Sequence, residues 1–213
     1  MTINHHPGEE LLLAYASGAA NEAVSLLVAS HLTLCPLCRA AVASAEAAGG
    51  SLLAELPPVP LDRQAYQALL ARLDEPSAEI LRNARLTSNV PAPLRPYIGT
   101  DFEAIAWRHI ADGLSHYPLV TKGGVRARLI RAMPGAAVAT HTHRGEEWTL
   151  VLTGSFSDAT GRYRIGDVQS TTPDVTHEPT ADPGPACINL AVTDAPLVFR
   201  GWLPKLVGKI HGF

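Results

Sequence analysis

The chain has 213 residues, of which 46% are hydrophobic and 17% charged, and its formal net charge is −3. These values exclude an intrinsically disordered protein and allow one large domain or two small ones. The longest apolar run, Leu11 to Ala16, is too short to cross a bilayer, and no charged segment followed by an apolar one marks a signal peptide. We therefore expect a soluble cytoplasmic protein with no membrane-spanning segment.

The charges are distributed unevenly along the chain. Residues 1–75 carry eight acidic and three basic side chains, a net charge of −5, so the remainder is +2. Affinity for nucleic acid comes largely from Lys and Arg that neutralise phosphates, so the acidic part argues against direct binding of DNA. It suits a basic protein partner better, although a solvated helical surface explains the same charges equally well.

The N-terminal residues have the periodicity of helices. Pro7 followed by two glutamates predicts a first helix, which Gly18 ends. Asn21 is a predicted N-cap for a second helix, in which Val24, Leu27, Val28 and His31 share one face. Both helices belong to a predicted helical domain at residues 1–75.

Two more helices are predicted in the same domain. Pro36 suits the first turn of a third helix, which we expect to end at Gly49-Gly50. A fourth begins at Asp62 and aligns the apolar side chains of Tyr66, Leu69, Leu70 and Leu73 along one stripe. A proline-rich stretch at 57–60 separates it from the first three helices.

Beyond residue 75 the pattern changes twice. Scattered prolines predict an interdomain linker at 76–96, with a short helical piece around 80–86. From 97 to 213 the period is two, which predicts an all-β sandwich or barrel. The predicted strands are separated by turns at Gly113, Gly123-Gly124, Pro134-Gly135, Gly154, Gly161, Gly166-Asp167, Pro173-Asp174 and Pro183-Gly184-Pro185.

The helical domain contains the pattern His31-x3-Cys35-x2-Cys38. Two cysteines across a helix start can bind one metal ion from a short arc of chain, and the helix N-terminus lowers the pKa of a thiol there. Three ligands leave a tetrahedral site incomplete, and the adjacent His5 and His6 both offer a fourth. A redox-active CxxC would normally follow a strand in a βαβ unit, which is absent, so we predict a structural zinc site.

The second half contains His141-x-His143-x3-Glu147 and a later His177. On a strand, residues two apart face the same side, so His141 and His143 both point inward. Glu147 returns from the next strand, and its neighbour Glu146 faces away. Three imidazoles and one carboxylate suit zinc, iron, manganese or nickel, and the spacing does not rank these ions.

The remaining cysteine and three other histidines lie outside these two patterns in the sequence. Cys187 is the third cysteine, and we expect a small buried side chain there. His109, His116 and His211 are expected to be ordinary, partly exposed residues.

These motifs carry a resemblance to known families. The segment Gly135-x5-His141-x-His143-x3-Glu147-x6-Gly154 resembles the first cupin motif. Gly166-Asp167 and Pro173-x3-His177 resemble the second, but its usual glycine after the proline and asparagine after the histidine are missing. His31-x3-Cys35-x2-Cys38 looks like the signature of zinc-binding anti-sigma domains. A zinc anti-sigma domain followed by a cupin resembles the ChrR family of transcriptional regulators, over essentially the whole chain.

The resemblance implies an α+β multidomain fold, with a small all-α helical bundle followed by an all-β cupin barrel. It implies a zinc-dependent anti-sigma factor, not an enzyme, that inhibits an extracytoplasmic-function sigma factor and releases it in response to singlet oxygen or related oxidants through the cupin. It also implies two zinc ions, with ligands His6, His31, Cys35 and Cys38 in one site and His141, His143, Glu147 and His177 in the other.

A metal-dependent cupin dioxygenase or isomerase with a helical accessory domain is the alternative. The same four inward side chains serve such enzymes when open coordination positions accept a substrate or dioxygen. A dedicated enzyme leaves the helical zinc unit unexplained, so we favour the regulator.

Overall fold

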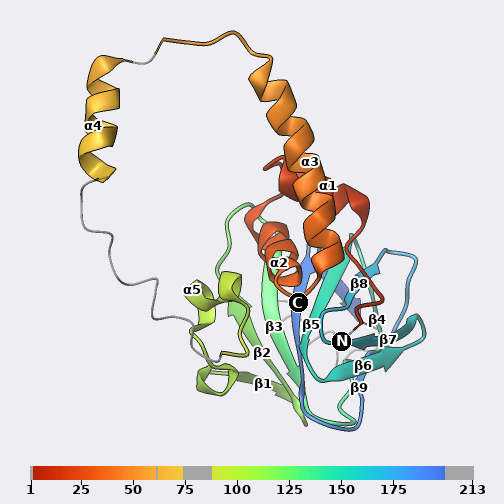
Figure 1. Ribbon diagram of the computed structural model, residues 1–213. Coiled ribbons are helices and arrows are strands. Elements are labelled where there is room, and N and C mark those ends of the chain that lie inside the picture. Colours follow the sequence, from red (N-terminus) through yellow and green to blue (C-terminus); the bar gives the residue numbers. More distant parts are fainter. Residues whose placement is uncertain (1, 61, 74–87, 200–213) are drawn as a thin grey trace.

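The computed structural model describes residues 2–60, 62–73 and 88–199 (Figure 1). Within these ranges no helix is both long and apolar enough to span a bilayer. The helices are α1 (Glu9–Ala16), α2 (Glu22–Leu32), α3 (Pro36–Ala54), α4 (Arg63–Leu73) and α5 (Arg95–Ile98), with short 3-10 helices η2 (Ala92–Leu94) and η3 (Phe102–Ala104). The strands are β1 (Arg108–Ala111), β2 (Leu114–Leu119), β3 (Arg126–Ala132), β4 (His141–His143), β5 (Glu147–Thr153), β6 (Ser155–Asp158), β7 (Gly161–Arg164), β8 (Val168–Thr171), β9 (Thr180–Ala181), β10 (Cys187–Thr193) and β11 (Leu197–Phe199).

The helix starts follow the capping residues in the sequence. The side chain of Asn21 caps α2 and accepts a hydrogen bond from the Val24 amide at 3.0 Å. Pro36 is the first residue of α3, as predicted. The predicted end of this helix at Gly49-Gly50 is wrong, because α3 continues to Ala54. A glycine inside a helix costs about 1 kcal/mol relative to alanine, and a helix this rich in alanine tolerates that cost.

The predicted four-helix bundle is not confirmed. Helices α1, α2 and α3 pack on one another, and the C-terminal half of α3 extends away from the β domain (Figure 1). Helix α4 stands apart from them at the end of an extended segment, and among the described residues none of its side chains is buried. The structure therefore contains a helical region of three packed helices and one isolated helix.

The C-terminal strands form antiparallel sheets of six, three and two strands. Their orders are β1-β2-β3-β10-β5-β8, β7-β6-β9 and β11-β4. The all-β prediction is confirmed, but the prediction of a closed barrel is wrong, since these sheets are not joined into one continuous ladder. Strands β4 and β9 have only three and two residues, and isolated bridges link Ala137 to Thr180 and His141 to His177.

The helical region and the six-stranded sheet share one hydrophobic core. Leu27 and Val28 of α2 are completely buried and belong to the same cluster as Leu129, Leu150 and Leu190 of the sheet. Helix α2 lies across strands β5 and β10, which places the N-terminal helices on the outer face of this sheet (Figure 1). The two halves of the chain are thus packed together, not merely tethered.

Part of the predicted linker at 76–96 contributes to this core. Val90 and Leu94 are 1% and 0% exposed, and η2 packs against α2. The short helix predicted around 80–86 lies outside the described residues. The segment that enters the β domain is therefore anchored on the helical region as well.

We expect Leu27→Ala to destabilise the protein by about 2–5 kcal/mol, because it leaves a cavity between α2 and the sheet. The matched control is Leu13→Ala on α1, whose side chain is 60% exposed and which should cost less than about 0.5 kcal/mol. Urea denaturation followed by circular dichroism measures both. Equal losses in the two variants would contradict a shared core.

Candidate metal centres

The helical region brings together His6, His31, Cys35 and Cys38. One ligand atom from each lies within 4.8 Å of the others. His6 Nδ1 is 3.5 Å from the sulfur of Cys35 and 3.3 Å from that of Cys38. Cys35 is the N-cap of α3 and its sulfur accepts a hydrogen bond from the Cys38 amide at 3.4 Å, so the helix start itself sets the spacing of the two sulfurs.

The histidine that precedes the cysteines is oriented for coordination. His31 is completely buried, and its Nδ1 donates to the carbonyl of Gly166 at 2.8 Å. This hydrogen bond leaves Nε2 as the lone-pair nitrogen, and within the described residues Nε2 has no hydrogen-bond partner. Burial lowers the pKa of His31, which favours the neutral ring that binds metals. A buried, unpartnered nitrogen beside two sulfurs fits a metal ligand.

The ionisation of the thiols also fits a metal site. Burial, together with the neighbouring Cys35, raises the pKa of Cys38 to about 12. Both cysteines are free and buried, and a cation bound between them would stabilise their thiolate forms. Two thiolates and two imidazoles form the donor set that zinc prefers.

The structure shows which of the two adjacent histidines, His5 or His6, can be the fourth ligand. His5 turns away from the cluster: its ring lies 4.5 Å from that of Tyr163, and its Nδ1 is 3.5 Å from Asp167. His6 is the one that faces the cysteines. Adjacent residues on an extended segment point to opposite sides, which is why only one of the pair reaches the cluster.

The β domain brings together His141, His143, Glu147 and His177, and all four are buried. His141 and His143 are the first and last residues of β4, and Glu147 begins β5. His177 lies opposite His141 in an isolated antiparallel bridge. The bridge is held by two backbone hydrogen bonds of 3.1 and 3.0 Å.

Two of these imidazoles face each other with their lone pairs. His141 donates from Nδ1 to the Ala139 carbonyl and His177 from Nδ1 to Asp158, both at 2.8 Å. Their Nε2 atoms are 3.1 Å apart, so in neutral rings two lone pairs meet. Burial lowers the pKa of His141 to about 4, which disfavours a proton there. A cation bound by both nitrogens would relieve this repulsion.

The carboxylate of Glu147 completes this cluster. His143 Nε2 is 3.0 Å from its Oε2. Burial opposes ionisation, but the hydrogen bond with His143 and the electrostatic attraction of the nearby imidazoles lower the pKa of Glu147 below its usual value. The donor set therefore carries one negative charge and three imidazoles, which fits a divalent cation.

A second layer of residues, not singled out in the sequence, orients this cluster. Asp158, at the end of β6, accepts hydrogen bonds from His177, Thr160 and Gln169. Burial opposes its ionisation, yet these donors hold the pKa of Asp158 well below its usual range. The sequence gives no signal for this role, because Asp158 precedes a turn and its partner His177 lies 19 positions away.

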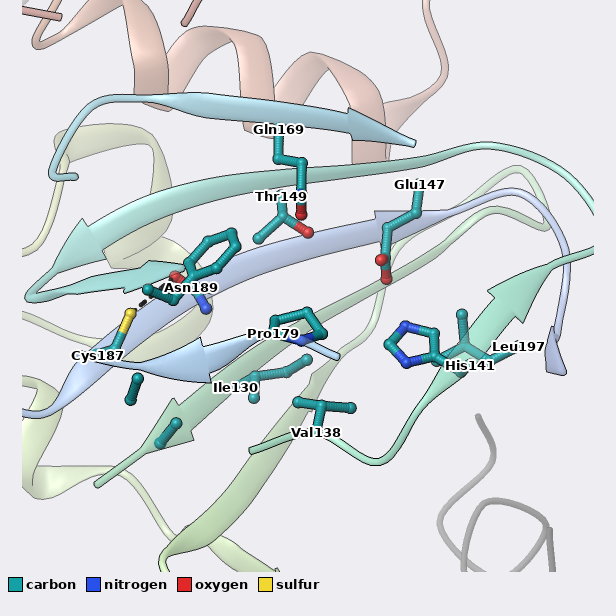
Figure 2. A pocket seen from close by; sticks show the side chains of 13 residues that line it. Ile130, Val138, His141, Glu147, Thr149, Gln169, Pro179, Cys187, Asn189 and Leu197 are labelled. Carbon is teal, nitrogen blue, oxygen red and sulfur yellow. Dashed lines mark hydrogen bonds between the residues drawn. The ribbon is translucent and has the colours of Figure 1, made fainter. Parts of the chain in front are cut away.

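A small cavity opens beside the second cluster (Figure 2). Its volume is about 40 Å³, which is room for a few water-sized molecules. His141 and Glu147 line one end, and Cys187 and Asn189 lie at the other, joined by a hydrogen bond from the thiol to the amide oxygen. Apolar side chains such as Ile130 and Val138 lie along the side (Figure 2).

The burial of the remaining cysteine and histidines agrees only partly with the prediction. Cys187 is completely buried, and burial raises its pKa to about 12, so it is a small buried side chain as predicted. His109 is exposed, but His116 is 2% exposed, which corrects the expectation of a partly exposed residue. It lies on β2, between β1 and β3. His211 lies outside the described residues.

Comparison with known proteins identifies the β domain first. The family described as the ChrR cupin-like domain matches residues 96–195. A cupin protein from Ralstonia eutropha is 19% identical over 46% of this chain and 69% of its own, with a TM-score of 0.40.

Two matches cover nearly the whole chain. The anti-sigma-E factor ChrR of Cereibacter sphaeroides is 44% identical over 97% of both chains. A crystal structure of Rhodobacter sphaeroides SigE in complex with the anti-sigma ChrR matches with a TM-score of 0.80 and 42% identity, over 91% of this chain and all of the other. The chain belongs to the ChrR family of anti-sigma factors, whose role is regulatory and not catalytic.

We expect Asp158→Ala to weaken metal binding at the second cluster by roughly 10–100-fold, because His177 loses the carboxylate that orients it. Titration of the metal-free protein with Zn²⁺ in a calorimeter measures this, and only one of the two binding events should change. Asp174→Ala, at an exposed turn position, is the control. Unchanged binding in Asp158→Ala would show that the carboxylate does not orient the ligand.

Proposed function

We propose that this protein is a zinc-dependent anti-sigma factor that binds an extracytoplasmic-function sigma factor and releases it in response to singlet oxygen or a related oxidant. The observation that carries the proposal is the match along both halves of the chain to an anti-sigma factor and to its complex with SigE. A likeness confined to the cupin-like domain would leave the function open, since that fold alone does not define one.

Zinc is proposed at both clusters. His6, His31, Cys35 and Cys38 would hold one ion, and His141, His143, Glu147 and His177 a second. A bound zinc ion would hold the ligands of each cluster together and would neutralise the ionised thiols or carboxylate. In the first cluster this ties the N-terminal segment, α2 and α3 into one unit, which gives the helical region a defined shape for a partner.

The sigma factor is proposed to bind the exposed apolar residues of α4 and of the end of α3. On α4, Tyr66, Leu69 and Leu73 are 51–72% exposed. Leu52 and Leu53 at the end of α3 are 68% and 69% exposed. The two helices follow each other in the chain, and exposed apolar side chains on them are costly in water and typical of a surface that a partner covers. The acidic charge of residues 1–75 favours a basic partner.

The cupin-like domain is proposed as the part that senses the oxidant. Its cluster borders a cavity that admits only a small molecule, which suits a reactive oxygen species better than a large substrate. The thiols of the first cluster are the more oxidisable groups in chemical terms, but coordination would mask them. The proposal therefore separates inhibition, in the helical region, from sensing, in the β domain.

The double variant Leu69→Asp and Leu70→Asp should weaken binding to the cognate sigma factor at least tenfold, because two charges would be buried at the interface. Zinc content should stay at the wild-type value. Val120→Asp, at a 91% exposed position of the β2–β3 turn, is the control. Binding is measured by co-purification and calorimetry with extracytoplasmic-function sigma factors from the same genome. Loss of zinc or of folding together with binding would instead assign α4 to the intramolecular core.

A chain that ends after Arg95 should still inhibit the sigma factor at saturating zinc but no longer release it under singlet oxygen. It keeps Val90 and Leu94, which pack against α2. Transcription by the sigma factor in vitro, with and without a photosensitiser, measures both properties. Normal release from the shortened chain would rule out the β domain as the sensor.

A further inference from the structure

The turn between β7 and β8 lies against the first metal cluster. It contains Gly166 and Asp167, which belong to the β domain, whereas all four residues of that cluster come from the first 38 residues of the chain. Both turn residues make hydrogen bonds to the helical region. Neither is within the second cluster.

Asp167 holds the N-terminal segment in place. Its side chain is buried, and Oδ1 accepts hydrogen bonds from the amides of Asn4 at 2.8 Å and His5 at 3.0 Å. The carbonyl of His5 in turn accepts from the Val168 amide at 3.0 Å. These three bonds fix the backbone next to His6, which leaves the His6 ring on the side of the cysteines.

Gly166 holds the second imidazole. Its carbonyl accepts from His31 Nδ1, which determines the tautomer and the orientation of that ring. Its φ is +90°, a conformation that glycine adopts readily, and a Cβ here would lie 2.6 Å from Cδ1 of Ile3. The absence of a side chain lets the N-terminal segment approach the turn closely.

We propose that Gly166 and Asp167 are positioning residues for the thiolate-containing metal site, so that the site is complete only when the helical region is docked on the β domain. The two cysteines are preset by the start of α3, but both histidines are oriented by the β7–β8 turn. Metal retention and docking then stabilise each other, since linkage between two sites is reciprocal.

This inference rests on the proposed function in one respect, that the first cluster holds a metal ion. It adds a physical route by which a change in the β domain reaches the helical region. A displacement of the β7–β8 turn would free His31 and the segment that carries His6, and the ion would then be held mainly by Cys35 and Cys38.

The test is titration of the full-length, metal-free protein with Co²⁺. Thiolate-to-cobalt charge transfer reports the first cluster alone, because the second contains no cysteine. Asp167→Ala should weaken Co²⁺ binding at this band by roughly 10–100-fold, as expected when the partner that orients a ligand is lost. Asp182→Ala is the matched control. Asp167 accepts a third hydrogen bond, from the Arg164 amide at 2.9 Å. Asp182 likewise accepts three, from Ser155, Ser157 and Arg162, but all within the β domain. It should change the affinity less than twofold.

A second pair of variants covers the case in which Asp167→Ala does not fold. Asn4→Pro removes one amide that donates to Asp167, whereas Asn4→Ala keeps that amide and removes only an exposed side chain. Weaker Co²⁺ binding in Asn4→Pro, with wild-type binding in Asn4→Ala, supports the proposal. Wild-type affinity in Asn4→Pro and in any folded Asp167→Ala overturns it.

Sigma binding, measured on the same variants, separates the two proposals. If Co²⁺ affinity falls and metal-depleted protein binds sigma as tightly as wild type, the positioning role holds and the role of the metal in sigma binding fails. If Co²⁺ affinity is unchanged while Leu69→Asp and Leu70→Asp still abolish sigma binding, the positioning role fails and the anti-sigma function stands.

Discussion

The hydrogen bond from His31 to the Gly166 carbonyl joins a helix to a turn 135 residues further along the chain. It selects the tautomer of a metal-ligand candidate, and it holds α2 against the sheet at the same point. Without this acceptor the buried N–H of the imidazole would be left without a hydrogen bond, which would cost about 1–3 kcal/mol of folding free energy. The first cluster and the docking of the two parts of the chain therefore depend on the same contact.

The two clusters are built by different means. In the first, Cys35 and Cys38 come from one helix start, and the histidines reach them from separate segments. In the second, β4 and the start of β5 supply three residues within seven positions, and all three lie on paired strands of the β domain. The first cluster is thus sensitive to how segments dock, whereas the second is part of the β domain itself.

An anti-sigma factor needs a stable form that binds its partner and a way to release that partner. The shared core of Leu27, Leu129 and Leu190 stabilises the docked arrangement, while α4 remains exposed with its apolar side chains in water. An inhibitor that keeps its proposed binding helix apart from its core does not have to unfold that core to engage or release its partner.

Local rules in the sequence determined much of this protein. Asn21 and Pro36 marked helix starts, the glycine and proline turns separated the strands, and alternation placed His141 and His143 on one side of β4. These features depend on neighbours within a few residues, so spacing alone predicts them.

Only the tertiary structure decided which long-range partners meet. His6, and not His5, reaches the cysteines, in a segment whose backbone Asp167 holds through two amide hydrogen bonds. His177 finds its partner Asp158 19 positions away in the chain. The open sheets, the isolated α4 and the shared core likewise follow from contacts between distant segments. Such contacts leave no periodic signal in the chain, because each is set by packing and hydrogen bonding in three dimensions and not by spacing along the sequence.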